Sequence, residues 1–88
     1  MATQILAAAN TQQTSGEFTL TEQKGIWLKS GGALHPEAKI VIEAKNSAGG
    51  WDIVETLHYG RHSGVLAAGV YRATRLGGNA VVGLEHAR

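Results

Sequence analysis

The stretch EAKIVIEAK, residues 37–45, decides the fold. Apolar side chains occupy every second position, and mostly charged side chains lie between them, which is the period of a strand with one buried face. The Ile-Val-Ile run is β-branched, and such stiff side chains fit a pleated sheet better than a helix, although Ala and Glu favour helices. We therefore expect a strand whose buried face carries Ala38, Ile40, Ile42 and Ala44.

A hairpin is expected directly after this strand. The segment NSAGG, residues 46–50, contains two glycines, and glycine adopts the positive φ that tight hairpin turns need. Residues 51–57 then form the returning strand. On a strict two-residue period, Trp51, Ile53 and Leu57 share its inner face.

The same alternation recurs along most of the chain. Further strands are expected at residues 17–21, 26–29, 65–68, 69–75 and 80–86. Six to eight short strands with regularly spaced turns are typical of an all-β protein, here a small antiparallel β-sandwich or a jelly-roll-like barrel. The expected core consists of Phe18, Leu20, Ile40, Ile42, Trp51, Ile53, Tyr71, Val82 and Leu84.

The length of 88 residues indicates one domain. Residues 17–88 are expected to form the β-sandwich, and residues 1–16 either an N-terminal strand or a flexible arm. Residues 1–9 contain no Lys or Arg, so they lack the charged start of a secretory signal. We expect the chain to be made and kept in a cytoplasm before any assembly.

Composition and charge argue against several classes of function. The formal net charge is +1, which gives neither the dense basic surface of a nucleic-acid-binding protein nor a polybasic membrane patch. The chain has no Cys, which excludes disulfides, thiolate metal sites and thiol nucleophiles. The apolar runs, such as residues 5–9 and 65–68, are far too short to cross a membrane as a helix. No nucleic-acid or membrane partner is therefore expected.

Residues that could support catalysis do not form a recognisable set. His58 and His62 have a spacing that suits a metal on a helix, but Gly60 and Gly64 interrupt this segment. The carboxylates are scattered, and neither a Gly-x-Ser-x-Gly elbow nor a Gly-rich phosphate loop is present. We expect no catalytic residue, no metal, no cofactor and no enzymatic activity.

The aromatic and Arg residues point instead to an interface. Trp27 alternates with Ile26 and Leu28, so either Trp27 or these two side chains face outward. An exposed Trp on a sheet is an interface anchor or a sugar-stacking platform, and we favour the interface. Arg forks suit salt bridges between subunits. The predicted interface residues are Trp27, Tyr59, Arg72 and Arg75.

Three motifs give the chain a resemblance to a known group. They are an Ile-x-Ile-Glu strand at residues 40–43, a Gly-Gly-Trp turn at residues 49–51 and a Gly-Val-Tyr-Arg strand at residues 69–72. In this order the chain resembles small β-sandwich proteins encoded among the virion genes of tailed phages, including head decoration (cement) proteins. The resemblance covers most of the chain, roughly residues 18–84.

The resemblance implies a structural function. Such a protein is made in the host cytoplasm, binds the major capsid protein on the outside of the virion as a homotrimer, and stabilises the shell by bridging capsomers. The alternative function is a carbohydrate- or receptor-binding module of a fibre or tail component. Its signature would be Trp27, Trp51 and Tyr59 exposed in one plane.

Overall fold

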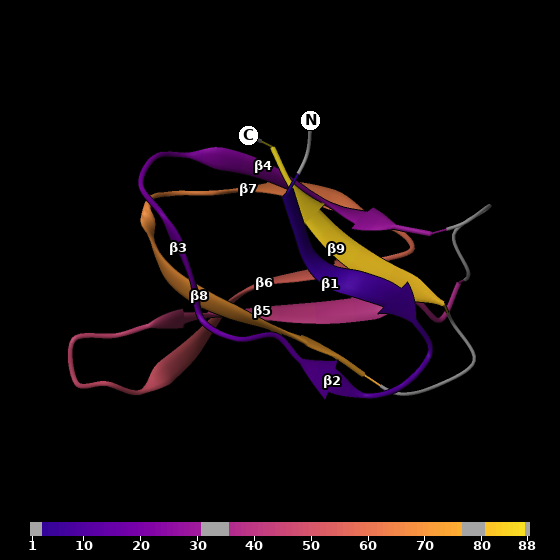
Figure 1. Ribbon diagram of the computed structural model, residues 1–88, viewed down its shortest axis with the longest axis horizontal. Helices are drawn as coiled ribbons and strands as arrows, with labels where there is room; N and C mark the ends of the chain where they lie inside the picture. The colour runs from indigo at the N-terminus through magenta and orange to yellow at the C-terminus, as the bar shows by residue number, and fades with distance from the viewer. Residues whose placement is uncertain (1–2, 31–35, 77–80, 88) are drawn as a thin grey trace.

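The protein is a sandwich of two antiparallel β-sheets. The computed structural model describes residues 3–30, 36–76 and 81–87, and within them the chain contains no helix. Nine strands form a four-stranded and a five-stranded sheet that pack face to face (Figure 1). The prediction of a small antiparallel β-sandwich is confirmed.

The sheets combine strands from distant parts of the chain. The four-stranded sheet has the order β1 (Thr3–Ala9), β9 (Val82–His86), β4 (Lys24–Lys29) and β7 (Ser63–Leu66). The five-stranded sheet has the order β2 (Gln13–Thr14), β8 (Gly69–Arg75), β5 (Lys39–Lys45) and β6 (Trp51–His58), and β3 (Phe18–Leu20) also pairs with β8. The described strands outnumber the predicted six to eight because β1 and the two-residue β2 form from residues 1–16. Ala80, which we placed in the last strand, lies outside the described residues.

The hydrophobic core lies between the two sheets. On β5, Ile40 and Ile42 are fully buried, and Ala38 precedes them on the same face, as the alternation predicts. Each fully buried Ile or Leu contributes about 1.5–3 kcal/mol through the hydrophobic effect. Six of the predicted core residues are buried, namely Leu20, Ile40, Ile42, Tyr71, Val82 and Leu84. Phe18 is partly buried and packs against them.

The N-terminal segment is a strand of the sandwich rather than a free arm. β1 pairs antiparallel with β9, from Thr3 opposite His86 to Ala9 opposite Val82, so the two ends of the chain lie side by side (Figure 1). Leu6 of β1 is buried in the core. β1 approaches β9 very closely, because a Cβ atom on Gly83 would lie 2.6 Å from the carbonyl oxygen of Leu6.

The β5–β6 hairpin forms where the sequence predicts it. The side-chain oxygen of Asn46 accepts hydrogen bonds from the backbone N–H groups of Ala48 (3.0 Å) and Gly50 (2.9 Å). This Asx-type bonding stabilises the turn, and Gly49 adopts a φ of 87°, which favours glycine. The hairpin extends beyond the rest of the five-stranded sheet (Figure 1).

The predicted inner face of β6 is wrong in the N-terminal half of the strand. In the C-terminal half, Leu57 is buried opposite Ile40, and Glu55 lies opposite Ile42. The next residue of β5, Glu43, pairs with Ile53 and not with Val54. Val54 is therefore an extra residue, a β-bulge that reverses the alternation. As a result Ile53 is 67% exposed and Trp51 is only partly buried, so neither belongs to the core.

Candidate protein-interaction surface

The bulge in β6 assembles a mixed aromatic, aliphatic and charged surface on the outside of the five-stranded sheet. The strand registers place Arg72, Glu43 and Ile53 in one row across β8, β5 and β6. Trp51 lies in the adjoining row, opposite Lys45. We call these four residues, Glu43, Trp51, Ile53 and Arg72, the outer patch.

Arg72 holds the outer patch together. Its guanidinium carbon lies 4.4 Å from the centroid of the Trp51 ring. Its Nε atom donates a hydrogen bond of 2.9 Å to Oε1 of Glu43. A cation–π contact of this kind contributes about 0.5–1 kcal/mol at a partly exposed site. The stack restrains the side chains of Arg72 and Trp51, so they lose little conformational entropy when a partner binds.

Ile53 gives the outer patch its apolar surface. This side chain is 67% exposed, and the neighbouring bulge residue Val54 is 50% exposed. Trp and Arg are the residue types most enriched among binding hot spots, where apolar contacts exclude water around them. The arrangement is therefore chemically suited to a flat protein partner that buries Ile53 and contacts the Arg72 guanidinium.

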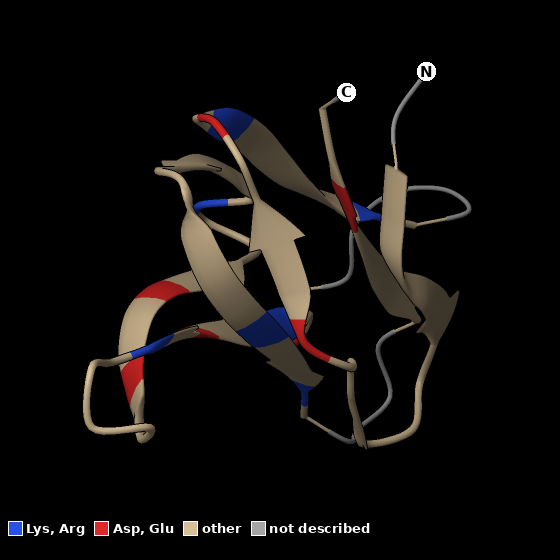
Figure 2. Ribbon diagram, turned by 60° about the vertical axis from the view of Figure 1, so that its left-hand side comes forward, with Lys and Arg blue, Asp and Glu red and all other residues tan. Residues whose placement is uncertain are grey.

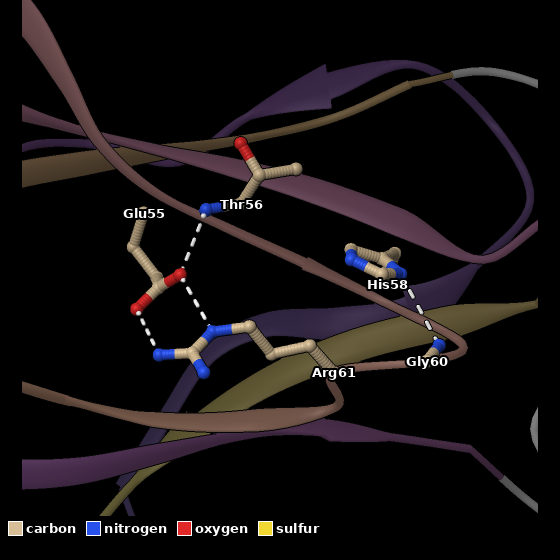
Figure 3. A network of polar contacts seen from close by, with 5 residues as sticks. All are labelled: Glu55, Thr56, His58, Gly60 and Arg61. Atoms are coloured by element: carbon tan, nitrogen blue, oxygen red, sulfur yellow. Dashed lines mark hydrogen bonds and ion pairs between the residues drawn. The ribbon is translucent and has the colours of Figure 1, made fainter.

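A second polar cluster secures the crossing from one sheet to the other (Figure 3). Arg61 donates two hydrogen bonds to Glu55, from Nε to Oε1 and from Nη2 to Oε2, both at 3.1 Å. The backbone N–H of Thr56 also donates to this carboxylate. The hydrogen bonds from Arg61 hold the pKa of Glu55 below its ordinary value, while partial burial opposes this effect.

The turn beside this cluster presents Tyr59. His58 and Arg61 exchange two backbone hydrogen bonds of 3.0 Å, and the N–H of Gly60 donates to Nδ1 of His58. This closes a tight turn with Tyr59 at its tip, 54% exposed. Tyr59 is thus accessible, but it lies away from the outer patch, at the crossing between β6 and β7.

Trp27 lies on the opposite side of the molecule from the outer patch. Ile26 and Leu28 are buried, which settles the register of β4 with Trp27 outward, on the outside of the four-stranded sheet. Trp27 is partly buried there, and its Nε1 donates a hydrogen bond of 3.0 Å to Glu85. Trp27 and Trp51 therefore belong to the outer faces of different sheets and do not share a plane with Tyr59.

Arg75 is not available for a contact between subunits, and this prediction is wrong. The side chain has 0% exposure. Its guanidinium donates hydrogen bonds to the carbonyl oxygens of Ala7 (2.6 Å), Thr11 (2.7 Å) and Val82 (2.9 Å), and to the side-chain oxygen of Gln13 (2.9 Å). Arg75 thereby fastens the N-terminal segment to both sheets, because β8 lies in one sheet and β9 in the other.

Charges are interleaved over the molecule rather than gathered by sign (Figure 2). The described residues contain no pocket and no cluster of three or more His, Asp or Glu side chains that could hold a metal ion. The same residues form no helix that is long and apolar enough to cross a membrane. The chain matches no protein-family model, no curated protein and no solved structure.

Two of the four outer-patch residues were assigned to the core by the sequence analysis. The sequence holds one hint, a carboxylate on the predicted inner face, but it does not mark where the alternation changes. A strict alternation from Leu57 back to Ile53 requires the carboxylate of Glu55 to point toward the core. The bulge at Val54 changes the phase between Glu55 and Ile53, and Arg61 satisfies the carboxylate.

Proposed function

We propose that the protein is a non-enzymatic structural protein of a tailed-phage virion, a decoration protein that stabilises the assembled shell. In this function the outer patch makes protein–protein contacts of the assembly. The observation that carries the proposal is the Trp51–Arg72 stack beside the exposed Ile53. Such a preorganised group, which joins aromatic, aliphatic and charged side chains on one face of a sheet, is suited to burial against another protein surface.

The motifs behind the phage resemblance support this assignment. Glu43 ends the Ile-x-Ile-Glu strand, Trp51 ends the Gly-Gly-Trp turn, and Arg72 ends the Gly-Val-Tyr-Arg strand. These three residues come from separate segments of the chain, yet Arg72 contacts both of the others on the outside of one sheet. Each of the three motifs thus contributes one residue to the same surface.

The proposed mechanism is thermodynamic. A protein that binds the assembled shell and not its separated subunits shifts the equilibrium toward the shell. Many copies on one lattice add their individually weak contacts through multivalency. The proposed partners are the major capsid protein and other copies of this chain, in the trimer that the resemblance implies. The proposed location is the outer surface of the virion.

Add-back to shells tests the proposal. Shells of the phage that encodes the chain would be prepared without the protein and incubated with purified wild type, Ile53→Asp or Val65→Asp. Val65 is a matched control, because it is 55% exposed on the outside of the other sheet. Wild type and Val65→Asp should cosediment with the shells and raise their disruption temperature.

Ile53→Asp should bind the shells at least tenfold more weakly, because a carboxylate would have to be desolvated in the contact. Failure of the wild type to bind shells at any concentration would overturn the proposed function. Equal binding by Ile53→Asp and the wild type would remove the outer patch from it.

A further inference from the structure

We propose that the partner of the outer patch is the outer patch of a second copy of this chain, with the two copies related by a twofold axis. This inference rests on the proposed function, because it names the partner of the same surface, and it puts a dimer in place of the trimer that the resemblance implies. In the pair, Arg72 of each copy bonds to Glu43 of the other.

The Arg72–Glu43 ion pair leaves binding capacity on both side chains. Among the described residues, the hydrogen bond between Nε and Oε1 is the one recorded for this pair. A guanidinium carries four further N–H groups in a fork, and a carboxylate has a second oxygen. Both side chains are partly exposed, Arg72 at 35% and Glu43 at 19%. A fork of this kind matches a second carboxylate.

The order of residues across the sheet makes the outer patch complementary to itself. The row runs Arg72 on β8, Glu43 on β5 and Ile53 on β6. We place the twofold axis parallel to the strands and midway between β8 and β5. Arg72 of each copy then lies over Glu43 of the other copy. The four charges then alternate in sign, which is the charge complementarity that an isologous contact requires.

The neighbouring rows are compatible with the same axis. Thr74 is paired with Val41, so these two uncharged residues face one another across the axis. Thr19 is paired with Val70 at the β3 side of the sheet. In the dimer Thr19 faces Trp51 of the other copy. No like charges are opposed in these rows. Aligned sheets of this kind pack about 10 Å apart.

The available area predicts a weak dimer. Four strands by five residues give a face of roughly 19 by 17 Å from standard strand spacing and rise. Two such faces have a combined area of roughly 650 Å², which is below the range of stable specific complexes and in the range of weak, transient ones. We therefore expect reversible association at micromolar to millimolar concentrations. Paired copies would hold a shell bivalently, which raises their effective affinity.

Sedimentation velocity over roughly 5–500 μM protein tests this contact. The wild type should show a concentration-dependent dimer that weakens in high salt, because its central contacts are charged. Ile53→Asp should raise the dissociation constant at least tenfold. Val65→Asp, the matched control on the other sheet, should dimerise like the wild type.

Charge reversal distinguishes the proposed contact from a merely apolar one. Arg72→Glu and Glu43→Arg each oppose like charges across the axis and should abolish the dimer. The double variant Arg72→Glu/Glu43→Arg re-forms every ion pair, within and between copies, but loses the stack of Arg72 on Trp51. It should restore the dimer with a dissociation constant within about tenfold of the wild type. Thermal unfolding of each variant shows whether it is folded, and the exposed Ile53→Asp keeps the test valid if a reversal variant does not fold.

A wild-type protein that stays monomeric at the highest concentration, or that forms a trimer in place of a dimer, would overturn the twofold contact. Unchanged dimerisation of Ile53→Asp would do the same. The add-back assay separates this failure from that of the proposed function. A monomer or trimer that binds shells refutes only the twofold contact, whereas a dimer that does not bind shells refutes only the function in the virion.

Discussion

Among the glycines that the structure describes, Gly83 leaves the least room for an added methyl group. A Cβ atom there would lie 2.6 Å from the carbonyl oxygen of Leu6 and 2.8 Å from the backbone nitrogen of Ala8. Both are backbone atoms of β1, so neither can rotate away as the end of a side chain could. Gly83→Ala must therefore push β1 away from β9.

The expected loss of stability has two parts. Overpacking a close contact costs about 1–3 kcal/mol. If β1 moves far enough to withdraw Leu6 from the core, about 2 kcal/mol of hydrophobic stabilisation is lost as well. We expect the free energy of unfolding to fall by about 3–5 kcal/mol. For a domain of this size the melting temperature then falls by roughly 12–40 °C.

Urea unfolding followed by Trp fluorescence, together with calorimetry, measures both quantities. Gly16→Ala is the matched control, because a Cβ at Gly16 would meet nothing within 4 Å and its φ is not positive. The control should change the free energy of unfolding by less than about 1 kcal/mol in either direction. A Gly83→Ala protein within 0.5 kcal/mol of the wild type, roughly the accuracy of such comparisons, would refute the close approach of β1 and β9.

Arg75→Lys should lower the free energy of unfolding, measured by urea titration, by about 2–4 kcal/mol. One ammonium group cannot reach the four acceptors that the guanidinium satisfies, so buried carbonyls lose their donors. A variant with full stability would show that these bonds are dispensable. The folded-state pKa of Glu55 is lowered, so its stabilising contribution is present above the unfolded pKa and is lost as pH falls through the folded value. Arg61→Gln should therefore flatten the decline of stability with acidification below about pH 5, near the ordinary carboxyl pKa, and an unchanged pH profile would contradict this assignment.

The extent to which sequence predicts this structure depends on how regular each strand is. In β5 the alternation is unbroken, and its inner face follows directly from the pattern. In β6 one extra residue reverses the pattern, and nothing in the apolar spacing alone marks where the reversal occurs. Trp51 and Ile53 were therefore assigned to the core, and the outer patch could not be predicted as a unit.

Arg75 shows a second limit of sequence patterns. An Arg at the end of a strand is ordinarily expected on the surface, because an unpaired buried charge is very unfavourable. Two of the acceptors that make burial possible are carbonyls of β1 and of the segment before β2, far away in sequence, and a third is a carbonyl of β9. Backbone carbonyls carry no sequence signature, so only the folded arrangement reveals that this side chain has enough partners.

The pairing of β1 with β9 has a consequence for how the molecule is made. Thr3 is opposite His86, so β1 can pair only after β9, which follows it by more than 70 residues, has been synthesised. Until then β1 has no partner strand, and residues 1–16 carry no charged side chain. Contacts that are this distant in sequence also slow folding. The growing polypeptide should therefore depend on chaperones, or on rapid completion of translation, to avoid aggregation through this segment.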